Sequence, residues 1–129
     1  MHKKSGFTII ELSLVIVVAI LATVLFVTQK EDINRHMRDQ QRKAAVNSLY
    51  FQLKDAFYPN NKYYPETINP DSLVGVDPEI FTDPGGKNLG EEGSDYIYTS
   101  SNCQDNRCQD FELKARLEQE ADFTRASRS

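Results

Sequence analysis

Proline and glycine are missing from a long part of this chain of 129 residues, since neither occurs between Phe7 and Tyr58. Both residues break helices, so their absence predicts one continuous helix over residues 7–57, which Pro59 and the two asparagines after it should end. All five prolines and five of the six glycines come later. Residues 58–94 are therefore predicted to be a loop, with a short helical turn at 70–74 or 77–81.

Catalytic signatures are also missing. The sequence contains no Gly-x-Ser-x-Gly, no P-loop and no glycine-rich dinucleotide pattern. Its two histidines, His2 and His36, lie in the N-terminal third, where neither is placed to serve a distal serine or cysteine. We therefore expect a protein that is not an enzyme and that holds no cofactor, with calcium as the one alternative considered below.

Charge is nearly absent from residues 7–27, where Glu11 is the single charged residue. A helix of 21 residues is about 31 Å long, close to the thickness of a bilayer's hydrocarbon core. A cleaved secretory signal would have a shorter apolar region and a small-x-small site after it. The rest of the chain is too polar to cover such a helix. Residues 7–28 are thus predicted to cross a membrane once, and Lys3 and Lys4 favour a cytoplasmic N-terminus.

Glu11 is the costly residue of this segment. A carboxylate near the start of a membrane span costs about 2–3 kcal/mol, and less near an interface. If the chain were cut between Gly6 and Phe7, the new α-amine would lie one helical turn from Glu11. The amine of a neighbouring subunit would then offer that carboxylate a partner. The alternative is a glutamate that simply reaches the membrane interface.

The N-terminal residues resemble the processing signal of type IV prepilins and type II secretion pseudopilins. The matching segment is Lys3-Lys4-Ser5-Gly6 followed by Phe7-Thr8-Ile9-Ile10-Glu11-Leu12. The resemblance implies that residues 1–6 are a leader, that prepilin peptidase cuts between Gly6 and Phe7 and N-methylates Phe7, and that Glu11 serves assembly. Many family members have a glycine and a proline in or just after the apolar run, where this chain has residues such as Ile20 and Thr28.

The same resemblance implies a function. The chain would be a structural subunit of a homo-oligomeric helical filament, built with other pilins on an inner-membrane assembly platform. It would be a single-pass membrane protein before assembly and part of an extracellular or periplasmic filament afterwards. The alternative is a minor pilin or a membrane-tethered binding module that does not form the main filament.

Residues 29–57 are predicted to be the extramembrane half of the helix. An apolar stripe with helical spacing lies in its second part and requires a packing partner; it consists of Val46, Leu49, Tyr50, Leu53 and Phe57. The charged residues at 30–43 are interpreted as a solvated helix face. The alternative is that Arg35, Arg38 and Arg42 meet acidic groups of neighbouring subunits.

The partner of the stripe is predicted in residues 95–129, a small antiparallel β-sheet head, which gives an α+β chain. The family resemblance implies that this architecture is the pilin fold. Residues 95–101 and 109–117 have strand character, and the second run alternates apolar with charged side chains. Residues 102–108 should form the hairpin loop. Residues 119–129 show little pattern, and 125–129 are expected to fray.

Cys103 and Cys108 lie near the two ends of that predicted loop, on either side of the turn. A zinc site needs four ligands, and neither histidine is near in sequence. The spacing is not Cys-x-x-Cys, so a thioredoxin-like redox site is not indicated. We expect a structural disulfide outside the cytoplasm.

Acidic residues dominate the C-terminal part. Residues 58–129 contain 14 Asp and Glu against 7 Lys and Arg, whereas residues 1–57 contain 5 against 8. Such a surface repels nucleic acid, so direct nucleic-acid binding is not expected. The acidic loop offers Asp77, Asp83 and Asp95 as weak calcium ligands without EF-hand spacing, and a solvated acidic loop is the alternative.

Overall fold

A computed structural model describes residues 6–128 of the chain. It contains two compact units, Met1–Arg35 and His36–Ser129. In the described part of the first unit, residues 6–8 are non-helical and the remainder belongs to the helix α1 (Ile9–Phe51). The second unit holds the end of α1 and all of the sheet. The predicted α+β class, a long N-terminal helix with a small antiparallel sheet, is confirmed.

The helical segment extends past the predicted end at residue 57. After α1 the chain forms a π-helical stretch, η1 (Gln52–Phe57), and a last turn, α2 (Tyr58–Asn61). The N–H of Tyr58 donates to the carbonyl of Leu53, the five-residue spacing of a π-helix. Pro59 lies in the first turn of α2, directly after the π-helical stretch, and Lys62 ends the helix in the left-handed conformation at φ 66°.

Four antiparallel strands form the sheet: β1 (Tyr64–Pro65), β2 (Tyr96–Gln104), β3 (Arg107–Ala115) and β4 (Phe123–Ala126). β3 is central, because it pairs with β2 along its length and with both β1 and β4. β1 lies in a segment predicted to be loop. β4 lies in residues 119–129, which show little pattern in the sequence. Its last two residues, Arg125 and Ala126, belong to the part expected to fray, so that expectation was wrong for them. The pairing with β3 supplies the order that local sequence does not indicate.

The core lies where the sheet covers the second half of the helix. Val46, Leu49, Tyr50 and Leu53 are at most 6% exposed, which confirms the predicted stripe, and Phe57 packs partly buried at its end. The inward face of β3 contributes Phe111, Leu113 and Ala115, as its alternation predicted. Stacked rings join the two layers, with the ring centroids of Tyr58 on α2 and Tyr64 on β1 4.8 Å apart.

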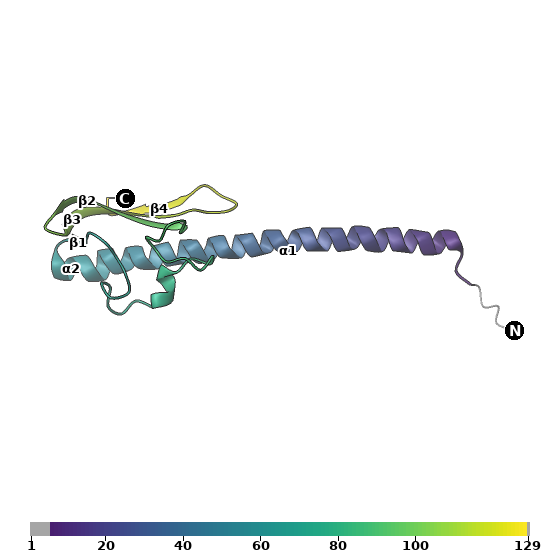
Figure 1. Ribbon diagram of the computed structural model, residues 1–129, viewed down its shortest axis with the longest axis horizontal. Coiled ribbons are helices and arrows are strands. Elements are labelled where there is room, and N and C mark those ends of the chain that lie inside the picture. The colour runs from purple at the N-terminus through teal and green to yellow at the C-terminus, as the bar shows by residue number, and fades with distance from the viewer. Residues whose placement is uncertain (1–5, 129) are drawn as a thin grey trace. The chain divides into compact units, whose positions relative to one another are not determined.

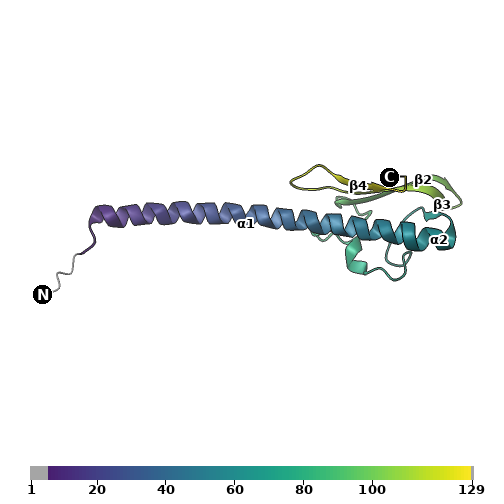
Figure 2. The ribbon, with the colours of Figure 1, turned by 180° about the vertical axis from the view of Figure 1, so that it is seen from behind.

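The connection between β1 and β2 covers another side of the helix. It contains a single short helical turn, η2 (Pro78–Phe81), which confirms one of the two predicted turns. Asp77 caps η2 by accepting the N–H of Glu79, and Leu73 and Phe81 fix the loop to the core at 2% exposure each. In Figures 1 and 2 the strands lie along one side of the C-terminal part of α1, and the loop with η2 lies on the opposite side.

Candidate functional site

The peptide bond between Gly6 and Phe7 lies in non-helical chain just before α1. Residues 6–8 have no regular secondary structure, and the Phe7 side chain is 76% exposed. A Cβ added at Gly6 would meet no atom within 4 Å, so packing does not require a glycine at this position. The other predicted leader residues, 1–5, lie outside the described residues.

Thr8 starts α1 as its N-cap. Its Oγ1 accepts a hydrogen bond from the N–H of Glu11 at 3.3 Å, which satisfies one of the free donors of the first turn. Glu11 consequently occupies the third helical position, where the positive end of the helix dipole favours a carboxylate. This local contribution has a signal in the sequence, because the Thr-x-x-Glu spacing is the usual sign of such a cap.

Glu11 differs from the other polar residues of the apolar run. The hydroxyls of Ser13 and Thr23 donate to the carbonyls of Ile10 and Ala19, both at 2.8 Å, so the helix itself satisfies them. The Glu11 carboxylate makes no hydrogen bond or ion pair with any residue from 6 to 128. Among residues 7–27, it is therefore the polar side chain that the described chain leaves without a partner.

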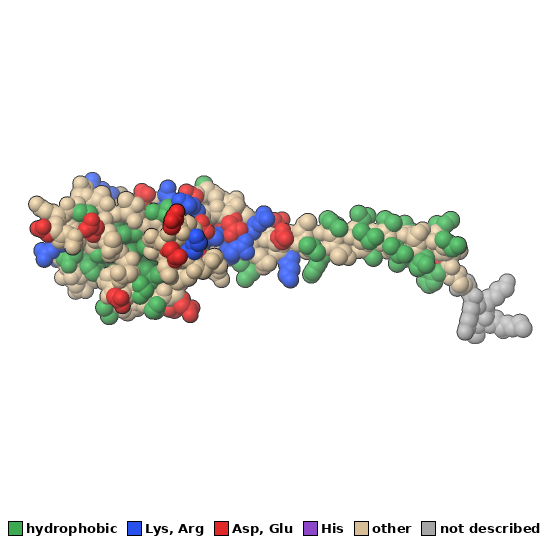
Figure 3. Space-filling model, viewed as in Figure 1, with side chains coloured by type: hydrophobic (Ala, Val, Ile, Leu, Met, Phe, Trp, Pro, Cys, Tyr) green, Lys and Arg blue, Asp and Glu red, His purple; other side chains and the backbone are tan. Residues whose placement is uncertain are grey.

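Apolar side chains cover the helix around Glu11 on every side. The large ones between Ile9 and Val27 are all exposed, from 52% at Ile16 to 88% at Ile9. An 18-residue window of the helix has a mean hydropathy of 2.9, and none of it is buried. Figure 3 shows these side chains in green over the N-terminal part of α1. By length and composition this helix is a candidate membrane span.

The charged face predicted at residues 30–43 is partly buried, so its interpretation as a solvated face was wrong for two residues. Asp39 is fully buried and Arg42 is 3% exposed. Arg42 donates from Nη1 to Asp39 and Glu118, at 3.0 and 2.8 Å, and from Nη2 to Asp95 at 2.8 Å. Arg38 binds the same Glu118 carboxylate through two bonds of 2.6 Å. These contacts lie within one chain. The guanidinium groups of Arg38 and Arg42 are therefore already bound, and they are not free to pair with acidic groups of neighbouring subunits.

The two buried charges continue the apolar stripe of the helix. Asp39 and Arg42 precede Val46, Leu49 and Leu53 at alternating spacings of three and four residues. This spacing places all five on one face, and it is the signal that would have revealed the burial. Charged residues at such positions need partners, and the segments around Asp95 and Glu118 provide them.

These contacts determine the ionisation state of the Glu118 and Asp39 carboxyl groups. Hydrogen bonds from Arg38 and Arg42 lower the pKa of Glu118 to about 2. Burial alone would raise the pKa of Asp39, but the backbone N–H groups of Glu118 and Gln119, together with Arg42, bring it below its usual value. Both carboxylates are therefore ionised at neutral pH, and the cluster is a set of compensated charges.

The predicted disulfide between Cys103 and Cys108 is present. The two residues are direct partners across β2 and β3, with Cα atoms 3.9 Å apart. The hairpin turn is shorter than the predicted 102–108 loop: Asp105 and Asn106, both with positive φ, form a two-residue turn between longer strands.

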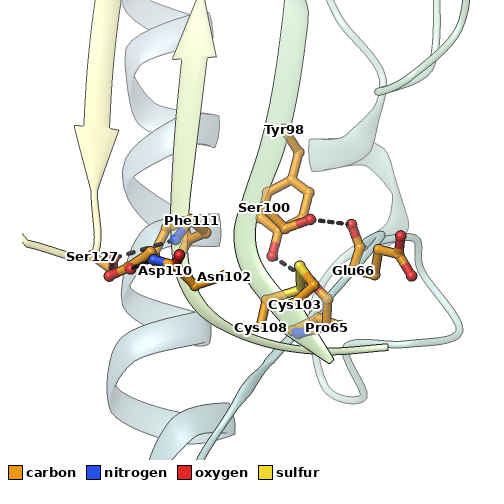
Figure 4. Close-up of a disulfide and its surroundings, with 10 residues drawn as sticks. All are labelled: Pro65, Glu66, Tyr98, Ser100, Asn102, Cys103, Cys108, Asp110, Phe111 and Ser127. Atoms are coloured by element: carbon orange, nitrogen blue, oxygen red, sulfur yellow. Dashed lines mark hydrogen bonds between the residues drawn. A yellow bond between two sulfur atoms is a disulfide. The ribbon is translucent and has the colours of Figure 1, made fainter. Parts of the chain in front are cut away.

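The surroundings of the disulfide connect it to the rest of the sheet. Figure 4 shows Tyr98 and Ser100 of β2 donating to the carbonyls of Pro65 and Glu66, at 2.6 and 2.9 Å. Cys108 is fully buried and pairs with Tyr64 of β1. The disulfide thus closes the hairpin at the end where three strands meet.

The three calcium candidates are separately engaged. Asp77 caps η2, and Asp95 binds Arg42. Asp83 is buried and accepts the N–H groups of Lys87 and Asp95, at 3.1 and 2.9 Å, and such bonds keep its pKa low despite its burial. Across residues 6–128, no group of three or more His, Cys, Asp or Glu side chains has the arrangement of a metal site.

Comparison with protein-family models, with curated proteins and with solved structures gave no match.

Proposed function

We propose that this chain is a structural subunit of a type IV pilus-like or pseudopilus filament, made as a precursor that prepilin peptidase cuts after Gly6. In this proposal Phe7 becomes the methylated N-terminus, and copies polymerise through the apolar part of α1. The membrane holds the subunit before assembly, and the helices of neighbouring copies replace the lipid afterwards.

The observation that carries the proposal is the Glu11 carboxylate. It lies in the first turn of a fully exposed apolar helix, and it has no partner among the described residues, while Ser13 and Thr23 are satisfied by the helix. An unpaired carboxylate in lipid is costly, so a partner from outside the chain would stabilise it. A freed α-amine at Phe7 of a neighbouring copy has the required charge and the required position along the helix.

The geometry before α1 supports processing at this point. The Gly6–Phe7 bond precedes the Thr8 cap, so a peptidase would not have to unwind the helix to reach it. Nothing near Gly6 requires a glycine, which fits a residue selected by the enzyme that binds it rather than by the fold. After cleavage, Glu11 would also offset the positive charge of the new N-terminus at the positive end of the helix dipole.

The test compares Glu11→Gln with Ser13→Ala in a bacterium that has the assembly machinery. Glu11→Gln keeps the size of the side chain and removes its charge, and we expect filament incorporation to fall about tenfold or more, because an ion pair in a low-dielectric bundle is lost. Ser13→Ala removes a hydroxyl that the helix already satisfies and should assemble normally. Immunoblots of sheared filaments and of membranes separate assembly from expression. Normal incorporation of Glu11→Gln would contradict the role of this carboxylate.

A further inference from the structure

The part of α1 that belongs to the second unit has one face that neither the sheet nor the loop covers. Figure 2 shows this part of the helix with the strands on one side of it and the loop that carries η2 on the other. None of its exposed residues is Asp, Glu, Lys or Arg, although these four types make up 26% of the chain. Among residues 36–51, the exposed ones are His36, Met37, Gln40, Gln41, Ala44, Ser48 and Phe51.

The charged residues of the same helical segment are all held by contacts within the chain. Arg38 binds Glu118 and Lys43 binds Glu120, both at 2.6 Å. Asp39 and Arg42 are buried in the ion cluster described above. A helix at the surface of a soluble unit usually has its charged residues toward water and its apolar residues toward the core. Here the open face has no such charges, which is the arrangement expected of a face that another molecule covers.

Two large apolar side chains on this face are more than half exposed. Met37 is 55% exposed and Phe51 is 52% exposed, and each lies seven residues from Ala44. A spacing of seven residues places side chains in one line along a helix, and it is the spacing by which one helix packs on another in a coiled coil. We call the line of Met37, Ala44 and Phe51 the seam. Ala44 at its centre is small, which lets the backbone of a second helix approach closely.

The membrane anchor indicates which helix is available to the seam. Copies that cross one bilayer by the same apolar helix are parallel, and each has its seam at the same distance along the chain from its span. Two identical seams can then meet in register, Ala44 against Ala44, without burying a charged residue. Confinement to one membrane also raises the effective concentration of the copies, so a short contact is sufficient.

We propose that the seam is a contact between two membrane-held copies of this chain, parallel and in register, made before any filament assembles. The contact uses the same residues on both copies, so it closes on itself and gives a pair rather than a polymer. Because it is short and bordered by polar side chains such as Gln40 and Ser48, it can be released when subunits assemble. The inference rests on one part of the proposed function, the membrane-held precursor, and not on the filament.

Cysteine cross-linking of full-length protein in membranes tests the contact, in a host without the assembly machinery. The two native cysteines are bonded to each other, so an added cysteine is the only free thiol. Ala44→Cys should give a disulfide-linked dimer under mild oxidation. Thr99→Cys is the control, since Thr99 is an exposed residue of β2, and it should give several-fold less dimer. Equal yields from the two variants would indicate random collision and overturn the contact, as would an adduct of Ala44→Cys with another protein in place of the dimer.

Added charge on the seam gives an independent test in the Ala44→Cys background. Met37→Glu places two carboxylates opposite each other in the pair, so the dimer yield should fall about tenfold. Because Met37 is exposed, the melting temperature should stay the same. Gln109→Glu is the matched control, since it adds the same charge at an exposed residue of β3 and should leave the dimer yield unchanged. A dimer yield that Met37→Glu does not lower would overturn the assignment of the seam.

The two proposals fail in different ways. If the Ala44→Cys dimer is absent while the wild type forms filaments in a host with the machinery, the contact alone is overturned. If the dimer forms and the wild type makes no filament in that host, the proposed function fails and the contact stands. If a high-salt wash releases the protein from membranes, the anchor is absent and both proposals are overturned.

Discussion

Arg42 and Asp39 lie one helical turn apart on α1 and are joined by a 3.0 Å hydrogen bond, with 3% and 0% of their surfaces exposed. The same guanidinium reaches Glu118 and Asp95, which come from segments distant in sequence. Asp39 also accepts the backbone N–H groups of Glu118 and Gln119, at 2.9 and 3.0 Å. One buried pair thus holds the chain after β3 and the chain before β2 against the helix.

Arg42→Met should destabilise the second unit strongly. Methionine fills similar space, but it leaves the buried Asp39 carboxylate without its cation, and losses of this kind are about 3–5 kcal/mol. The measurement is denaturant unfolding of the full chain in detergent, followed by the near-ultraviolet circular dichroism of tyrosine, because the chain has no tryptophan.

Arg116→Met is the control for that variant. Arg116 is exposed, and its bond to Asp95 is made by the backbone N–H alone, so its substitution should change the free energy of unfolding by about 0.5 kcal/mol or less. Equal effects of the two substitutions would show that burial of the cluster contributes nothing to stability.

Acid should weaken the same cluster. Because the pKa of Glu118 is lowered from 4.5 to about 2 in the folded chain, its ionised form stabilises the fold above about pH 4.5, and this contribution is lost as the pH falls toward 2. The lowered pKa values of Asp39 and Asp83 act in the same direction. The melting temperature should therefore be nearly flat between pH 7 and 5 and fall between pH 4.5 and 2. Glu118→Gln should have a lower melting temperature than the wild type at pH 7, and its melting temperature should fall less in acid. An equal fall in the two proteins would show that a group other than Glu118 is responsible.

Loss of the disulfide should lower the free energy of unfolding by less than loss of the ion cluster does. It closes a loop of six residues, for which the chain-entropy estimate is about 2 kcal/mol. Cys103→Ser with Cys108→Ala tests this, since Cys103 is exposed and Cys108 is buried in apolar surroundings. Reductant should lower the melting temperature of the wild type to nearly that of the double variant and should leave the variant unchanged. A wild type insensitive to reductant would contradict the stabilising role.

Local periodicity explains which parts of the fold were predictable. The stripe at Val46, Leu49 and Leu53 and the alternation of β3 are properties of neighbouring residues, and both packed as expected. β4 was missed because Phe123–Ala126 is ordered by its pairing with β3 rather than by its own pattern. Arg128, in a segment expected to fray, binds Asp110 through two bonds of 2.7 and 2.8 Å.

The residues of the candidate site were also predictable only where their signal is local in the sequence. Glu11 could be singled out from sequence because it is the one charged residue among the 21 of residues 7–27, most of which are apolar. The ion cluster could not be predicted in this way, because Arg42 and Glu118 are 76 residues apart, so their pairing has no local signature.

The most direct test of the proposed function is mass spectrometry of the mature N-terminus of protein purified from a host with prepilin peptidase. The account predicts a chain that begins at Phe7 and carries a methyl group on its α-amine. An intact Met1, or a cut beyond Val27 that removes the whole apolar segment, would contradict it.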